Sequence, residues 1–393
     1  MIGRYAAHMD FALDETDEQI VGLARGFVDR EIVPHIRDWD RAESVDTAII
    51  GRLGEIGFLG LGIAEEYGGT PSSFQAYVGV MEELGRGDNA VRGIVSVSLG
   101  LVAKSIAAHG TDDQKEQWLP RLASGEALGC FGLTEPDSGS DPGSLRTRAR
   151  REGDDWVLDG EKMFITNGTW AAVALVFART TDDGGRGVTA FLVPTDAPGF
   201  TARSIEGKLG LRGQATAALS LEGVRVPDSA RLGDLGRGLP IALEALTKGR
   251  ISVAASSVGV AQAALDVALG YATERTQFGG PIAAKQLVQE LLADSAVEID
   301  AARLLTRRAA WGVDQGTSLR ALTLHVSMAK LSASETAVAV TNRCLQVLGG
   351  YGFIDEFPLG KYLRDARVLT LYEGTSQIQK LIIGRELTGL NAM

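Results

Sequence analysis

Apolar residues recur at helical spacing through the first third of the chain. In residues 18–40 the apolar positions are Ile20, Val21, Leu23, Phe27, Val28, Ile32 and Val33. Residues 46–57 and 73–84 show a similar pattern, and residues 90–108 form a long apolar segment with two single charges. Because positions three and four residues apart share one face of a helix, we predict an α-helical domain over residues 1–125.

The pattern changes near residue 126, where Gly, Asp, Thr and Pro become frequent. Short runs of β-type residues follow at 156–158, 163–166, 172–178, 188–193 and 217–221. Segments rich in Asp and Gly separate these runs, as turns between strands do. The sequence therefore predicts an all-β middle domain over residues 126–235.

Long helical patterns return after residue 236. Residues 239–274 are rich in Ala, and residues 282–313 and 319–348 are each longer than about 25 residues, which is long for a globular helix. Long neighbouring helices of this kind pack as a bundle. The predicted fold is α+β and multidomain, with a helical bundle domain over residues 236–393.

Composition narrows the class of protein. The chain has 393 residues, 45% hydrophobic and 23% charged, which is typical of a soluble globular enzyme. A net charge of -11 and a pI of about 5.0 argue against nucleic acid or an anionic membrane as the main partner. No apolar run is long enough to predict a transmembrane helix, and the N-terminal segment lacks the apolar core of a secretory signal.

Cysteine and histidine usage predicts neither a disulfide framework nor a metal site. Cys130 and Cys344 lie far apart, no CxxC pair occurs, and the four histidines are scattered. This usage fits a reducing compartment, so we expect a cytoplasmic protein without a bound metal.

The hexapeptide YEGTSQ at residues 372–377 holds the first candidate for chemistry. Glu373 follows an apolar run, and a carboxylate in apolar surroundings is a weaker acid than one in water, because desolvation penalises its charged form. Such a group is suited to accept a proton near neutral pH. Gly374 lets backbone and ligand approach closely. The same residues are also compatible with an ordinary turn.

Four other segments carry residues suited to ligand binding. They are GLTEPDSGSD at 132–141, FITN at 164–167, RTQFG at 275–279 and QVLGGYG at 346–352. The first is dense in small and hydroxyl residues, and free backbone N–H groups in such a turn can bind phosphate or pyrophosphate. Taken singly, each segment is better explained by structure, as an interdomain loop, a strand end or a helix cap.

Together with LYEGTSQ at residues 371–377, these motifs in this order and spacing resemble the acyl-CoA dehydrogenases, and the resemblance covers nearly the whole chain. It implies an N-terminal helical domain, a middle β-barrel and a C-terminal four-helix bundle. It also implies an FAD enzyme acting on acyl-CoA, with an electron-transfer flavoprotein or a similar acceptor as partner. Members of this family form homotetramers as dimers of dimers, in which two subunits contact each FAD.

The resemblance assigns roles to matching positions. Contacts to FAD within one subunit are implied for Phe131, Leu133, Thr134, Gly139, Ser140, Phe164 and Thr166. Contacts to the FAD of the neighbouring subunit are implied for Arg275, Gln277, Phe278, Gln286, Gln346, Gly349 and Gly350. Thr375 and Gln377 would contact the adenine and pyrophosphate part. At Phe164 many relatives have tryptophan, which leaves an aromatic surface beside the flavin but changes the outer contact for an electron acceptor.

The implied reaction is α,β-desaturation of an acyl thioester, with Glu373 as the base that removes the α proton while the β hydrogen leaves as hydride to flavin N5. The residues implied at the acyl-CoA are Arg92, Ser96, Ser140, Arg250 and Gly374. In some branches of the family the base sits just before the arginine that matches Arg250. Here that position is Gly249, which has no side chain, so Glu373 is the expected base.

Arg92 bears on the substrate, because it stands in an otherwise apolar segment. It could face solvent or pair with Asp88 one turn away. The local sequence, with Ser96, also resembles the glutaryl-CoA dehydrogenase branch, in which an arginine binds the distal carboxylate of the substrate. The position matching a nearby glutamate of that branch is Gly85. That glycine is a departure from the branch. Because arginine suits bidentate binding of a carboxylate, a dicarboxylyl-CoA such as glutaryl- or adipyl-CoA is expected. The YEGTSQIQ ending at residues 372–379 resembles ordinary acyl-CoA dehydrogenases more than the decarboxylating branch, so desaturation without decarboxylation is expected.

Several alternatives stay open. The substrate could be a plain short or branched acyl-CoA, and a decarboxylating glutaryl-CoA dehydrogenase is also compatible with the motifs. An acyl-CoA oxidase or a flavin monooxygenase could share the fold. A flavin-free helical scaffold or binding protein is the non-enzymatic alternative, and the visible spectrum of the purified protein would discriminate it.

Overall fold

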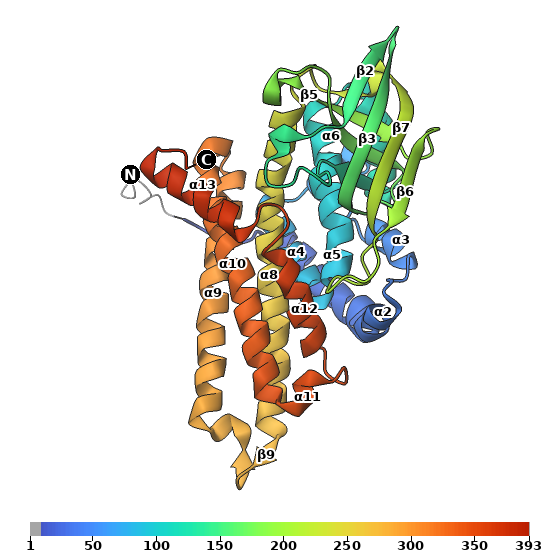
Figure 1. The fold of residues 1–393 in the computed structure, drawn as a ribbon. Helices are drawn as coiled ribbons and strands as arrows, with labels where there is room; N and C mark the ends of the chain where they lie inside the picture. Colours follow the sequence, from blue (N-terminus) through green and yellow to red (C-terminus); the bar gives the residue numbers. More distant parts are fainter. Residues whose placement is uncertain (1–8, 393) are drawn as a thin grey trace.

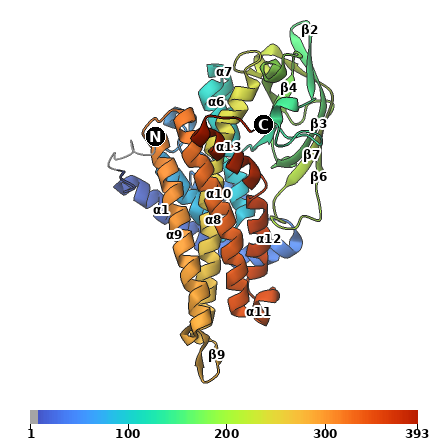
Figure 2. The same ribbon diagram turned by 60° about the vertical axis from the view of Figure 1, so that its left-hand side comes forward.

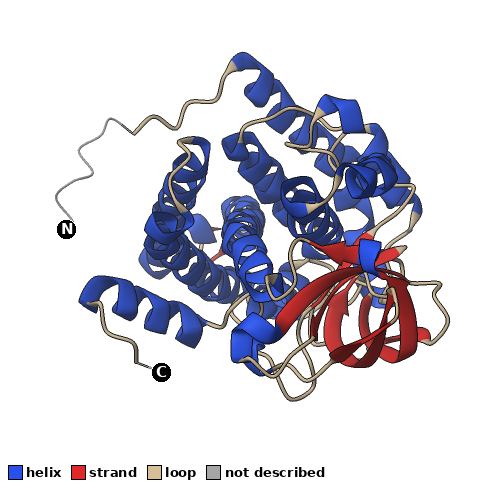
Figure 3. Ribbon diagram, turned by 90° about the horizontal axis from the view of Figure 1, so that it is seen from above, coloured by secondary structure: helices blue, strands red, loops and turns tan. Residues whose placement is uncertain are grey.

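The computed structural model describes residues 9–392 of the chain (Figure 1). The chain passes through a helical part, a strand-rich part and a second helical part. The predicted α+β multidomain fold class is confirmed. Figure 3 shows the strands gathered on one side, with helices covering the rest of the molecule.

From residue 9 onward, the first part contains seven α-helices. They are α1 (Glu15–Phe27), α2 (Ile36–Ala42), α3 (Ala48–Glu55), α4 (Phe74–Gly87), α5 (Asn89–Val95), α6 (Lys104–His109) and α7 (Asp112–Ser124). The sequence marks their starts: the Asp14 side chain accepts a hydrogen bond from the N–H of Asp17, and Thr111 and Gln114 form a capping box.

Two predicted helices differ in detail from the structure. The helix expected over 18–40 is broken by a π-helical turn, Val28–Ile32, and a 3-10 turn, Val33–His35. Pro34 lies in the second turn, and it has no backbone N–H to continue the helix. The apolar segment 90–108 is helical throughout, because the π-helical stretch Ser96–Ala103 joins α5 to α6.

The middle part forms an eight-stranded sheet with the order β6-β7-β3-β2-β4-β5-β8, and β1 pairs with β4. The strands are β1 (Gly129–Gly132), β2 (Arg148–Glu152), β3 (Asp155–Thr166), β4 (Val173–Arg179), β5 (Val188–Pro194), β6 (Phe200–Ser204), β7 (Thr216–Pro227) and β8 (Arg231–Leu232). The sheet is strongly curved (Figure 3). Register shifts along the β3–β7 ladder fall beside Gly160 and between Lys162 and Ile165, where bulges bend β3.

The last part is built on three long helices that run side by side (Figures 1 and 2). They are α8 (Gly238–Glu274), α9 (Gln286–Asp314) and α10 (Leu319–Leu348), followed by α11 (Gly350–Phe353), α12 (Leu359–Leu369) and α13 (Ser376–Thr388). A short hairpin of β9 (Thr276–Gln277) and β10 (Gly280–Pro281) lies at the end of the bundle. A Cβ added at Gly259 would lie 2.0 Å from the Glu82 carbonyl oxygen, so glycine allows α8 to pack tightly on α4.

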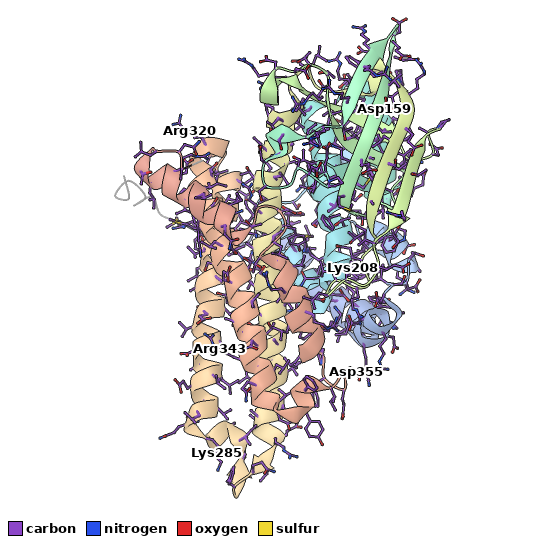
Figure 4. The ribbon with its side chains drawn as sticks, viewed as in Figure 1. Asp159, Lys208, Lys285, Arg320, Arg343 and Asp355 are labelled. Carbon is purple, nitrogen blue, oxygen red and sulfur yellow. The ribbon has the colours of Figure 1, made fainter. Side chains whose placement is uncertain are left out.

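Charged side chains join the three parts. Asp355 lies on the turn between α11 and α12 (Figure 4). It accepts hydrogen bonds from Arg37 and Arg41 of the N-terminal part. In the interior, Lys361 of α12 lies 2.6 Å from Asp365 and 3.2 Å from Asp88, the residue that caps α5. Asp365 also accepts the N–H of Leu211, in the loop before β7, at 2.6 Å. This buried cluster connects α5, α12 and the loop before β7.

Within the described residues, two helical stretches are long and apolar enough to span a membrane by length and composition. They are Asn89–His109 and Gly238–Glu274. Of the most apolar window of each, 89% and 83% lie buried inside the protein. Their apolar surface is therefore used in packing against other elements.

Candidate active site

The loop between α12 and α13 presents Glu373. Glu373 and Gly374 both have positive φ angles, 51° and 93°, a conformation that is uncommon for a residue with a side chain. Three side chains hold the backbone of this loop. Arg250 Nε donates to the Glu373 carbonyl at 2.9 Å, Lys330 Nζ donates to the Gly374 carbonyl at 2.8 Å, and Gln379 Nε2 donates to both. We call Arg250, Lys330 and Gln379 the carbonyl clamp.

Glu373 is half-buried, and one of its two carboxylate oxygens is enclosed without a hydrogen bond. Its Oε2 atom is out of contact with solvent and has no hydrogen-bond partner. Burial raises the pKa of Glu373 above that of an ordinary glutamate, and the positive charges of Arg92, Arg250 and Lys330 oppose the rise. A Cβ added at Gly249 would lie 2.3 Å from this oxygen, so the glycine on α8 provides the space that the carboxylate occupies.

Arg92 lies close to Glu373 in the protein interior, with 1% of its surface exposed. Its guanidinium donates to Ser96 Oγ at 2.9 Å and to the Tyr372 hydroxyl, and lies 5.7 Å from the centre of the Tyr372 ring. The alternative pairing with Asp88 is not formed, because Asp88 binds Lys361 and caps α5. Among the described residues no carboxylate lies within ion-pair distance of Arg92.

Tyr77 of α4 is a further buried group near Glu373 and Arg92. Burial raises the pKa of Tyr77 to about 12, with the charges of Glu373 and Arg92 acting on the same hydroxyl. Its hydroxyl lies where a side chain at Gly100 would stand, 2.8 Å from an added Cβ. Tyr77 was not predicted from the sequence, because an aromatic residue in an apolar helix is usually a core residue.

The GLTEP segment leaves β1 beside β3. Phe131 and Leu133 are 8% and 6% exposed, and the Thr134 carbonyl accepts the N–H of Met163 in β3 at 2.9 Å. Lys162, also in β3, donates to the Leu133 carbonyl and pairs with Glu135 at 2.8 Å. This buried ion pair fixes the segment, and Lys162, which lies outside the predicted motifs, was not expected at the site. The following turn leaves Gly139 open and Ser140 exposed.

The end of β3 carries two more of the predicted residues, Phe164 and Thr166. Phe164 has a positive φ of 61° and its side chain is 67% exposed, although the residue is large and apolar. The Thr166 hydroxyl lies 3.4 Å from Gln214 Oε1. A Cβ added at Gly93, the residue after Arg92, would lie 3.8 Å from Thr166 Cγ2, so the end of β3 packs against α5 beside Arg92.

The second set of predicted flavin contacts lies elsewhere in the chain. A cavity of about 620 Å³ at the end of the bundle is lined by Arg275 and Gln277, from the hairpin, and by Gly349 and Gly350, at the end of α10. Gln346 lies on the last turn of α10 and Gln286 begins α9. Figures 1 and 2 show this hairpin at the end of the bundle away from the sheet. A single chain therefore does not bring these predicted flavin-binding residues close to Glu373.

Three further predicted residues, Phe278, Thr375 and Gln377, do not line this cavity. Phe278 is 94% exposed on the hairpin and has a positive φ of 50°. Thr375 caps α13, since its hydroxyl accepts the N–H of Ile378 at 3.3 Å. Gln377 is exposed on the first turn of the same helix.

Three family models match consecutive parts of the chain. The N-terminal domain of acyl-CoA dehydrogenase matches residues 14–126, the middle domain residues 130–224, and the C-terminal domain residues 236–388. The chain belongs to the acyl-CoA dehydrogenase family. It is thus an FAD-dependent oxidoreductase, as the motifs predicted.

Individual relatives are similar over nearly their whole length. The mitochondrial short-chain specific acyl-CoA dehydrogenase of Bos taurus is 40% identical over 98% of this chain and 92% of that protein. A glutaryl-CoA dehydrogenase from Mycobacterium smegmatis in complex with FADH2 is 39% identical, with a TM-score of 0.92 over 97% of this chain and 96% of that one. A chain from a study of the electron transferring flavoprotein of Acidaminococcus fermentans is 38% identical, with a TM-score of 0.94 over 97% and 100%.

The residues of this chain fit FAD. Phe164 is a large apolar residue that is 67% exposed, two positions before Thr166 on β3, and such a surface suits a large planar group. The Glu373 oxygen without a hydrogen-bond partner lies against Gly249 of α8. The exposed Gly139–Ser140 turn offers backbone N–H groups for a pyrophosphate.

Proposed function

We propose that the protein desaturates an acyl-CoA between its α and β carbons, with Glu373 as the base that removes the α proton. The observation that carries this proposal is the buried Glu373 oxygen without a hydrogen-bond partner, held by the carbonyl clamp. A base must have a free lone pair within reach of the proton that it accepts. FAD, when bound, supplies the acceptor for the β hydrogen as hydride.

The charges around Glu373 suit this role. Burial raises the pKa of the carboxyl, which strengthens it as a base, while three nearby cations keep the anionic form accessible. The same cations favour the negative charge that develops on a thioester oxygen as the α proton leaves. Within the described part of the chain the N–H of Glu373 makes no hydrogen bond, so it is a candidate donor to that oxygen.

Replacing Glu373 by Gln tests the assignment. The variant keeps the size of the side chain but cannot accept the proton, and loss of a general base costs about 10³-fold in rate. We expect a yellow protein with normal FAD content and no flavin bleaching by acyl-CoA under anaerobic conditions. Turnover near the wild-type rate would refute the role of Glu373.

We also propose that Arg92 binds the distal carboxylate of a dicarboxylyl-CoA of the glutaryl or adipyl type. Its support is a buried guanidinium that lacks a carboxylate partner among the described residues, with Nε unbonded. Burying an unpaired charge is costly, whereas a bidentate carboxylate would satisfy it. The glutamate of the glutaryl-CoA dehydrogenase branch has no counterpart at Gly85, where an added Cβ would lie 2.5 Å from the Ser256 backbone.

A plain short-chain acyl-CoA is the second candidate, since Arg92 can also balance the charge of Glu373. Anaerobic bleaching of the flavin with butyryl-, glutaryl- and adipyl-CoA separates the two. For a dicarboxylate substrate, replacing Arg92 by Met lowers kcat/KM for glutaryl-CoA far more than for butyryl-CoA. An equal change for both would refute the carboxylate role. Release of CO2 would identify the decarboxylating reaction, and oxygen uptake an oxidase.

We infer, finally, that the enzyme is a homotetramer that passes electrons to an electron-transfer flavoprotein. The support for the assembly is the distance between the two sets of predicted flavin residues within one chain. A mixture of Glu373→Gln and Arg275→Ala chains tests it. Mixed dimers contain one intact composite site, so partial activity should return when the two inactive proteins are refolded together. No recovery would contradict sites shared between subunits.

A further inference from the structure

Three lysines are buried among the described residues, and two of them are paired with carboxylates. Lys162 lies 2.8 Å from Glu135, and Lys361 bridges Asp88 and Asp365. Burying an ammonium group costs desolvation free energy, and a carboxylate partner offsets part of that cost.

Lys330 is the exception. It is fully buried on α10, and no carboxylate of the described chain lies within ion-pair distance of its Nζ atom. Its hydrogen bond goes to a backbone carbonyl, that of Gly374, at 2.8 Å. A methionine would fill the same volume without the desolvation cost. The charge of Lys330 is therefore unexplained by packing alone.

Lys330 bonds to the residue that follows Glu373. We propose that Lys330 is a positioning residue for the base: it holds the Gly374 carbonyl, and its ammonium charge favours the ionised form of the Glu373 carboxylate. This inference rests on the proposed role of Glu373. One buried side chain would thus both support the conformation of the loop and favour the ionised state of the Glu373 carboxylate.

The loop geometry requires such support. Glu373 and Gly374 are held at positive φ, which for Glu373 is an unfavourable conformation. The neutral member of the carbonyl clamp, Gln379, bonds to both carbonyls, and Arg250 bonds to that of Glu373. Gln379 therefore offers a matched control, because its loss removes a donor to the same carbonyl without changing the charge.

The groups that face Glu373 come from four elements besides its own loop. They are Tyr77 of α4, Arg92 of α5, Arg250 of α8, Lys330 of α10 and, in the loop itself, Tyr372. Burial lowers the pKa of Lys330 to about 8, while the charge of Glu373 opposes this. The two groups thus influence each other, and each favours the charged state of the other.

The test compares the FAD-loaded wild type with Lys330→Met, Lys330→Arg and Gln379→Met. The pH profile of kcat/KM is measured with butyryl-CoA or glutaryl-CoA, whichever turns over, and a dye as acceptor. A second readout is independent of turnover: calorimetry in two buffers of different ionisation enthalpy gives the protons taken up when crotonyl-CoA binds, as a function of pH.

We expect Lys330→Met to move the acid limb, and the midpoint of proton uptake, upward by about 1 pH unit, since a nearby positive charge is lost. Lys330→Arg should return both to the wild-type position. Gln379→Met should lower kcat without moving the limb. If Lys330→Met does not fold, Lys330→Gln replaces it, with the same expected shift.

An acid limb and uptake midpoint that stay in place in Lys330→Met would overturn the inference, as would a shift of equal size in Gln379→Met. The Glu373→Gln variant distinguishes a failure of the proposed function from a failure of the role of Lys330. If that variant turns over, the proposed function fails. If it is inactive and the limb of Lys330→Met is unmoved, only the role of Lys330 fails.

Discussion

Gly249 on α8 offers the most direct test of the site geometry. A Cβ added there would lie 2.3 Å from Oε2 of Glu373 and 3.0 Å from Leu101. An ordinary contact begins at about 3.4 Å, so Gly249→Ala displaces the carboxylate by about 1 Å. Misplacement of a reacting group by that amount costs about 100-fold in rate, or about 2.7 kcal/mol.

Because the displaced atom is the end of a flexible side chain, the fold should tolerate the change. We therefore expect kcat/KM of Gly249→Ala to fall about 100-fold while FAD content and Tm stay near wild type. Gly270→Ala is the matched control on the same helix, since an added Cβ there has no neighbour within 4 Å. Full activity in Gly249→Ala would show that Glu373 is not the base or does not work from this position.

Three other results are expected. Because burial raises the pKa of Glu373 and the base must be ionised, kcat/KM should fall on acidification at a pH above the ordinary glutamate value of 4.5; a rate that is flat down to that pH would contradict this. Lys162→Met leaves Glu135 buried without its partner, so it should destabilise the protein by about 3 kcal/mol or more and reduce FAD retention, which thermal unfolding and the visible spectrum check. Burial raises the pKa of the Cys130 and Cys344 thiols to about 12, so neither should react with a thiol reagent at pH 7.5 until the protein is denatured; rapid labelling of the folded protein would contradict this.

Much of the fold was predictable because its signals are local. Apolar periodicity located the long helices, and frequent turn residues located the strands. The break at Pro34 within a helix predicted as continuous shows the limit of periodicity, since apolar positions continue on both sides of it. The π-helical stretch after α5 leaves no signal in the pattern of apolar residues.

At the site, Glu373 and Arg92 could be singled out because each is a charge in an apolar segment. Lys330 could not, because its depth depends on how α10 packs and its partner Gly374 is 44 positions away. The separation of Arg275 from Glu373 was equally hidden. Order along the chain does not tell which end of a long helix a residue will occupy in space.

The close approach of Gly249 and Glu373 also has an evolutionary consequence. A side chain at residue 249 and a glutamate at residue 373 compete for the same volume, so the two positions cannot change independently. Loss of the glutamate alone removes the proposed base, and gain of a side chain at 249 alone displaces it. Either order of substitution therefore passes through an impaired enzyme. This epistasis opposes the stepwise transfer of the base from the loop between α12 and α13 to α8.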